Sequence, residues 1–154
     1  MPIDHHLPLV TLFREAFEGR PEGQPYTWFV EKTEGIFDAM EHTSAAQAST
    51  SPAPGVNTIG AHLNHVRYTL SLTNAHIRGE QPESDWEGSW TQQTFDEEAW
   101  RQLGSDLRRE YEAVLRFFET RPDWPEQDWL MGASALVPHM AYHLGAIRQL
   151  MKLV

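Results

Sequence analysis

Hydrophobic residues recur at helical spacing in the second half of the chain. Between residues 96 and 120 they stand three or four positions apart and so share one helix face: Trp100, Leu103, Leu107, Tyr111, Val114, Leu115 and Phe118. The last stretch repeats the pattern with Leu136, Met140, Leu144, Ile147 and Met151. We find no strand-like alternation of apolar and polar positions. The pattern predicts an all-α fold.

Breaks in the pattern divide the chain into five predicted helices, at residues 9–17, 26–46, 57–78, 96–120 and 133–153. Asn57 or Thr58 can cap the third helix and Asp96 the fourth, because short polar side chains bind the free N–H groups of a first turn. Gly79 can end the third helix. The loops that contain proline or glycine are expected at 19–25, 49–56 and 121–128.

The connection between the third and fourth helices, residues 80–94, is unusually long and contains Trp86 and Trp90. A connection of this length is normally packed or functional. The two helices beside it are therefore not expected to form a simple hairpin. With 154 residues, the chain is expected to form one domain. We predict a four-helix bundle with a long crossover connection and a short extra N-terminal helix.

Composition and charge narrow the possible partners. The formal net charge of −10 argues against nucleic acid, whose backbone is bound through lysine and arginine. No apolar run is long enough to span a bilayer, so a membrane partner is not expected. The N-terminal residues lack the basic and apolar regions of a secretory signal, which favours the cytoplasm.

The chain has eight histidines and no cysteine, so histidine is the prominent candidate metal ligand. His139 and His143 are four residues apart on the last predicted helix, which places their rings on one side, one turn apart. This spacing is common among pairs of metal ligands. The alternative is that each ring is a core histidine bonded to a protein group. A buried polar ring needs a partner in either case.

A third ligand must come from another helix, and His62 and His65 both qualify. Ile59, Leu63 and Val66 mark the buried stripe of the third predicted helix, and His62 lies nearer to that stripe than His65. Periodicity alone therefore favours His62.

Two segments of the sequence resemble the DinB/YfiT-like superfamily of four-helix bundles. They are Thr58-Ile59-Gly60 followed by His65-Val66, and the run from His139 to Gln149, HMAYHLGAIRQ. The resemblance extends from about residue 26 to the end. It implies a divalent-metal site of His65, His139 and His143, with His62 as a neighbour and zinc or nickel as the ion.

The same resemblance implies a metal-dependent enzyme, either a hydrolase or a thiol-dependent S-transferase. Its partners would be a small-molecule substrate, a low-molecular-weight thiol and a second copy of the chain in a homodimer. The alternative is a non-catalytic, metal-binding or stress-associated helical dimer. Trp86, Trp90 and Trp100 are candidate walls of a pocket, while Asn64, Tyr68, Tyr142 and Arg148 are candidate supports of the metal ligands.

Overall fold

The computed structural model describes residues 6–30, 34–120 and 127–154. Over these ranges the chain is helical and contains no strand, which confirms the predicted all-α fold. The elements are α1 (His6–Glu18), α2 (Ile36–Glu41), α3 (Ala45–Ala48), α4 (Ile59–Ile77), the 3-10 helix η1 (Gly88–Trp90), α5 (Glu97–Thr120) and α6 (Gln127–Leu150). None of the helices in the described part of the chain has the length and apolar character to cross a membrane.

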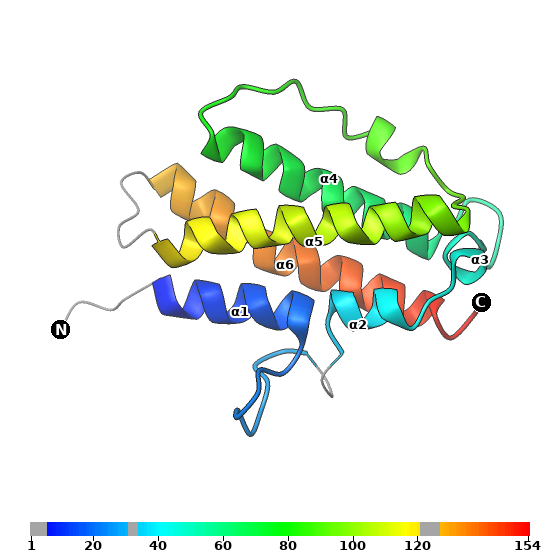
Figure 1. The fold of residues 1–154 in the computed structure, drawn as a ribbon, viewed down its shortest axis with the longest axis horizontal. Coiled ribbons are helices and arrows are strands. Elements are labelled where there is room, and N and C mark those ends of the chain that lie inside the picture. The colour runs from blue at the N-terminus through cyan, green and yellow to red at the C-terminus, as the bar shows by residue number, and fades with distance from the viewer. Residues whose placement is uncertain (1–5, 31–33, 121–126) are drawn as a thin grey trace.

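The helices form a bundle in which α4, α5 and α6 lie side by side with a row made of α1 and α2 (Figure 1). Helices α5 and α6 each pack against α4 and against α1. The N-terminal helix is therefore part of the bundle and not an addition to it. Helix α2 continues the row beyond the end of α1 and also packs against α6.

Helices α4 and α5 run in the same direction, as their colours show, because the intervening segment returns along α4 before α5 begins (Figure 1). The predicted crossover connection is thus present. Thr58 caps α4 by accepting a hydrogen bond from the Ala61 N–H at 3.2 Å. Gly79 ends α4. Its φ of 80° is a backbone conformation that only glycine adopts readily. The Asp96 side chain accepts from the Ala99 N–H at 2.8 Å, as expected for the cap of α5.

The predicted helix at 26–46 is wrong. Residues 26–30 are not helical, residues 31–33 lie outside the described part, and only α2 and the start of α3 fall within the predicted range. The backbone N–H groups of Trp28, Phe29 and Val30 donate to the carboxylate of Glu15, at 2.6–2.8 Å. Glu15 is fully buried, so the chain wraps around it and cannot continue as a helix there.

Gly35, the residue just before α2, lies where the backbone leaves room only for glycine. A Cβ at this position would lie 2.3 Å from the carbonyl oxygen of Phe17, so the backbone passes too close to the end of α1 for any side chain. Helix α3 then begins with a capping box, in which Ser44 and Gln47 bind each other's backbone N–H groups. These contacts divide the predicted helix into separate short elements.

The predicted range of the last helix is also corrected, because α6 begins at Gln127 and ends at Leu150. The predicted loop 121–128 falls mostly on residues 121–126, outside the described part. Asp128 lies in the first turn of α6, where a negative charge is favourable next to the free N–H groups. The ring of Trp129 packs 5.8 Å from that of Phe117 on α5. This contact between helices stabilises the first turns of α6. The apolar stripe alone does not predict these turns.

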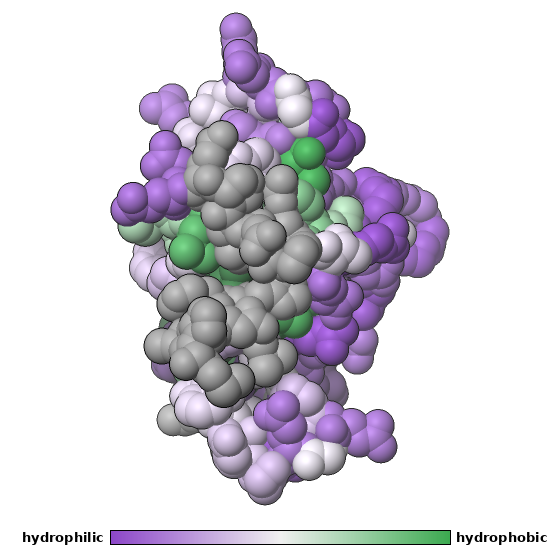
Figure 2. Space-filling model, turned by 90° about the vertical axis from the view of Figure 1, so that its left-hand side faces the viewer, coloured by the Kyte–Doolittle hydropathy of each residue, from purple (hydrophilic) through white to green (hydrophobic). Residues whose placement is uncertain are grey.

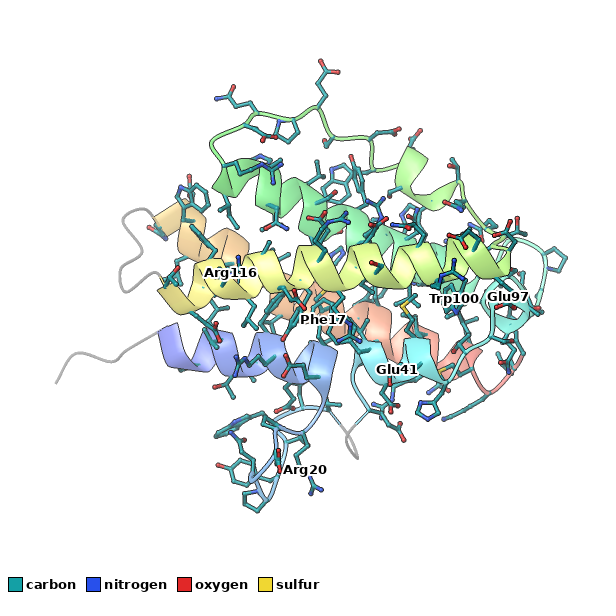
Figure 3. The ribbon with its side chains drawn as sticks, viewed as in Figure 1. Phe17, Arg20, Glu41, Glu97, Trp100 and Arg116 are labelled. Carbon is teal, nitrogen blue, oxygen red and sulfur yellow. The ribbon has the colours of Figure 1, made fainter. Side chains whose placement is uncertain are left out.

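Aromatic rings fill the interior between α1 and α5. The rings of Phe13, Phe17 and Phe118 are fully or almost fully buried, and the Tyr111 ring lies 4.6 Å from that of Phe17. Figure 3 shows Phe17 in this interior, near the end of α1. The space between α4 and α6, in contrast, contains imidazole rings.

Candidate metal centre

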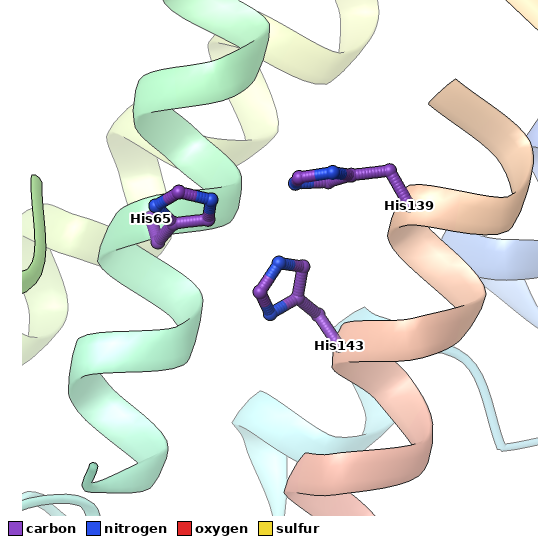
Figure 4. A group of neighbouring side chains, drawn as sticks. All are labelled: His65, His139 and His143. Carbon is purple, nitrogen blue, oxygen red and sulfur yellow. The ribbon is translucent and has the colours of Figure 1, made fainter. Parts of the chain in front are cut away.

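Three imidazole rings converge between α4 and α6 (Figure 4). His65 comes from α4, and His139 and His143 come from successive turns of α6. Each ring offers one nitrogen atom, and these three atoms lie within 4.8 Å of one another. His65 is 5% exposed and His143 is 1% exposed, whereas His139 is half-buried. The three predicted ligands are therefore brought together, with His139 on the accessible side.

The structure separates the roles of His62 and His65. His62 is also buried, but its ring lies against His143 and outside the group of three. Periodicity correctly indicated that His62 faces the interior, while the family resemblance indicated the residue that joins the group. The Trp90 ring of η1 contacts both rings, with centroids 5.1 Å from that of His62 and 4.2 Å from that of His65.

A chain of hydrogen bonds orients the His65 ring. The Ser89 hydroxyl donates to the Trp86 carbonyl oxygen at 2.6 Å, and its oxygen lies 2.7 Å from Nδ1 of His65. A hydroxyl has one proton, so His65 Nδ1 is the donor in the second bond. The other ring nitrogen, Nε2, then carries the lone pair. Ser89 thus holds His65 in the tautomer that can bind a metal through Nε2.

His62 contacts His143 in a similar way. Their Nδ1 atoms are 3.0 Å apart, so one of the two donates to the other. When His143 is the donor, its Nε2 keeps the lone pair that a metal requires. His62 is thus placed to orient a candidate ligand.

The third ring, His139, has a weaker contact. Its Nε2 lies 3.4 Å from the hydroxyl oxygen of Thr69, at the long end of the hydrogen-bonding range. The Thr69 hydroxyl donates to the backbone carbonyl of His65 at 3.0 Å. Of the three rings, His139 is therefore the one with the most freedom to adjust to an ion.

Burial keeps the cluster neutral at physiological pH. It is the largest influence on all four histidines, and it lowers the pKa of His65 to about 4 and that of His143 to about 3. Repulsion from the neighbouring histidines is the smaller part of both of these shifts. Burial also lowers the pKa of His62 and of His139. Neutral imidazole is the form that binds a metal, so no proton has to be removed at pH 7.

These residues fit a divalent ion in donor type and in spacing. Neutral imidazoles suit zinc, nickel, copper and iron. Two nitrogens bound to one ion through bonds of about 2.1 Å lie at most about 4.2 Å apart. That limit applies to two nitrogens on opposite sides of an ion, and ligands at the tetrahedral angle lie about 3.4 Å apart. The three nitrogens here lie within 4.8 Å of one another, so the rings would rotate towards one another to hold an ion. Three protein ligands leave at least one position for another molecule, as catalytic sites do.

The crossover supplies aromatic cover for the cluster. The Trp90 ring stacks on His65 with 4.2 Å between centroids and an angle of 19°. The Trp86 ring lies 5.8 Å from His65 and is 46% exposed. Trp100, the third predicted pocket residue, lies in the first turn of α5 at one end of the bundle (Figure 3), where its ring packs against Phe95 and its N–H donates to the Thr43 carbonyl. The prediction for Trp100 is therefore wrong.

The other predicted supports of the ligands have different roles. The Asn64 side chain donates to the Ser89 carbonyl at 3.0 Å, and the Tyr68 hydroxyl accepts from the Asp85 N–H at 2.5 Å, so both fasten the crossover to α4. Tyr142 is 70% exposed, with its ring at right angles to His143. Arg148 forms an ion pair with Glu34 at 2.6 Å. Ser89 and Thr69 were not predicted, since nothing local in the sequence marks their contacts with histidine.

A cavity of about 690 Å³ begins beside His139 and extends towards the start of α6. Its lining is mainly apolar and comes from α4, the crossover, α5 and α6. Trp86, Thr69 and His139 line the part next to the metal centre. A molecule in the cavity would therefore lie next to one of the three rings.

Comparison with known proteins was made at the level of families, curated proteins and solved structures. The sequence model of the DinB superfamily matches residues 29–147, most of the chain, and this range contains all three histidines. No curated protein and no solved structure matches. The helical bundle and the group of histidines that can hold a metal ion agree with the family match. The chain belongs to the DinB superfamily.

Proposed function

We propose that this chain is a metal-dependent enzyme that binds one divalent ion, zinc or nickel, through His65, His139 and His143. The observation that carries the proposal is the convergence of three neutral imidazoles within 4.8 Å, next to a cavity that can admit a small molecule. A purely structural cluster would not need to lie beside a cavity.

A bound ion would supply Lewis acidity at this place, lowering the pKa of water or of a thiol so that either can act as a nucleophile near pH 7. The chain's own residues have two tasks. Ser89 and His62 hold two rings in the orientation that the ion needs. Trp90 covers His65 and limits the access of water from the crossover side.

Of the two reaction classes, thiol-dependent S-transfer fits these residues better than hydrolysis. Among the described residues, the cavity lining contains one carboxylate, that of Asp128. Eleven residues separate it from His139 on α6, or about 16 Å at 1.5 Å per residue, too far to remove a proton at the metal centre. With no closer carboxylate among the described lining residues, activation of the nucleophile would rest chiefly on the ion. A thiol, with a pKa of about 8.5, needs a much smaller shift than water at about 15.7.

Metal analysis tests the first part of the proposal. Protein loaded with zinc or nickel and then desalted should retain about one ion per chain, as expected for a three-histidine site. The variant His143→Ala should retain none, because the most deeply buried ligand is lost. A matched control is His42→Ala, since His42 is exposed and lies outside the cluster. Equal metal content in the two variants would contradict the proposed site.

The reaction class is tested with the loaded enzyme, 1-chloro-2,4-dinitrobenzene and a small thiol such as cysteine. The sulfur forms a bond to the ring carbon, chloride leaves with the bonding electrons, and the thiol proton passes to solvent. Thiol-dependent formation of the coloured thioether, lost on metal removal, is the expected result. Hydrolysis of a nitrophenyl ester without thiol-dependent transfer would support the hydrolase instead. Stoichiometric metal with neither activity would favour the non-catalytic alternative.

A further inference from the structure

We infer that the cavity beside His139 binds an elongated, uncharged, largely aromatic molecule, with one end at the metal centre. The inference rests on the proposed function and adds to it the class of the second substrate, the one that the activated nucleophile attacks. The lining of the cavity, its length and its position relative to the three histidines support the inference independently of any activity.

The lining determines the chemical class. Rings come from three sides of the cavity: Trp86 from the crossover, Phe117 and Phe118 from α5, and Trp129 from α6. Leu72, Ile77 and Leu136 add aliphatic surface. Aromatic walls favour a flat ligand, because rings pack best against other rings at stacked or edge-on distances. Hydrophobic residues also reach the surface at this end of the molecule (Figure 2).

The dimensions determine the shape. The lining runs along α6 from Asp128 to His139, about 16 Å at the rise of an α-helix. Its volume of about 690 Å³ lies in the range of pockets for drug-sized molecules. The polar side chains of the lining at its metal end are Thr69 and His139, both next to the cluster. A ligand can therefore lie along the cavity with its reactive group towards the histidines.

Gly132 offers a precise way to block the cavity. It lines the cavity from α6, and a Cβ added there meets no atom within 4 Å. The variant Gly132→Leu should therefore fold, since leucine is also the better helix former. Gly145 provides the matched control, because it lies on the same helix, is equally open to a Cβ and does not line the cavity.

The test uses the neutral apolar fluorophore N-phenyl-1-naphthylamine and metal-free protein, with folding verified by circular dichroism. Wild type and Gly145→Leu should bind the fluorophore with similar affinity. Gly132→Leu should weaken binding by about tenfold or more, the equivalent of about 1.4 kcal/mol. A second blocking variant, Ala135→Trp, places a large ring in another part of the lining and should have the same effect.

Competition defines the ligand class. 4-Phenylphenol should displace the fluorophore, whereas biphenyl-4,4′-dicarboxylate, of similar length but doubly charged, should not. Absence of fluorophore binding to wild type, equal affinity in all four proteins, or equal displacement by both competitors would overturn the inference. Because His143→Ala should still bind the fluorophore, failure of the metal site and failure of the cavity proposal give different results.

Discussion

At the scale of single residues, His62 is the unusual feature of the centre. It is a buried histidine that touches a candidate ligand, His143, through a nitrogen-to-nitrogen contact of 3.0 Å. Partners of this kind fix the ring and its tautomer and are often nearly as important as the ligand itself. We therefore predict that His62 has a role beyond packing.

Replacing His62 should distinguish between packing of the core and orientation of the His143 ring. The variant His62→Leu keeps a side chain of similar size but removes the ring nitrogen that contacts Nδ1 of His143, so metal affinity should fall by about 10- to 100-fold. His62→Asn offers an amide oxygen near the position of Nδ1 and should retain most of the affinity. Competitive titration with a chromogenic chelator measures both variants. An equal loss in the two variants would show that His62 serves only to pack the core.

The stability of the metal-free protein should depend on pH through the buried histidines. The pKa of His65 is lowered to about 4 and that of His143 to about 3, against about 6.5 in the unfolded chain. Below about pH 6.5 the unfolded chain therefore binds protons that the folded chain does not. The free energy of unfolding should fall as the pH decreases from 6.5 towards 4, by at most about 1.4 kcal/mol per pH unit for each histidine.

Urea denaturation at pH 7.5, 6.5 and 5.5 measures this dependence. The double variant His65→Asn, His143→Asn lacks both groups and should show a shallower decrease than wild type. Carboxylates contribute equally to both proteins, so the difference between the two slopes isolates the histidines. Identical slopes would mean that the two rings are not held neutral by the fold.

At the scale of elements, Glu15 decides the path of the chain between α1 and α2. Its carboxylate is fully buried and accepts three backbone N–H groups. Hydrogen bonds to a charged group are worth more than neutral ones, about 1.5–3 kcal/mol each. Replacing Glu15 with alanine would leave three donors without this acceptor.

We expect Glu15→Ala to lower the free energy of unfolding by about 3–5 kcal/mol, since the freed N–H groups are only partly compensated by water. Glu22→Ala is the matched control, as Glu22 is an exposed carboxylate in the same loop. Guanidinium denaturation followed by circular dichroism gives both values. A loss below about 1 kcal/mol, no larger than for an ordinary neutral hydrogen bond, would show that the loop does not depend on Glu15.

The helices that could be predicted from the sequence have their signals in their own local sequence. Helices α4, α5 and α6 carry their signals locally, in an apolar stripe, and α4 and α5 also in caps such as Thr58 and Asp96. The segment 26–46 also has apolar residues at helical spacing, but its structure depends on Glu15 and on the contact of Gly35 with Phe17. These partners are distant in the sequence, so local periodicity predicts the wrong element.

The candidate site likewise combines features that the local sequence predicts with features that depend on distant residues. The spacing of His139 and His143 is local to one helix and could be predicted from geometry. The choice of His65 over His62 depends on how the crossover lies across α4, which the helical pattern of α4 does not contain. Ser89 illustrates this limit, because it reaches His65 from 24 residues away along the chain. Family resemblance supplied the choice because it carries information about the whole fold.

At the scale of the whole molecule, charge and topology both bear on function. The net charge of −10 attracts cations to the protein and repels anionic molecules. This charge agrees with a cation as the bound group and with an uncharged second substrate. The homodimer implied by the family resemblance stays a prediction.

The parallel arrangement of α4 and α5 requires a connection that runs back along the full bundle, and this connection is fastened to α4 at several points. The Thr58 hydroxyl donates to the Gln93 carbonyl at 2.9 Å, and the Asp85 N–H donates to Tyr68. A loop bound in this way belongs to the same cooperative unit as the helix beneath it. The amide proton of Asp85, which is bound to Tyr68, would exchange with solvent only when the crossover separates from α4. The crossover is therefore a fixed wall of the cavity, to which it contributes Pro82, Ser84 and Trp86.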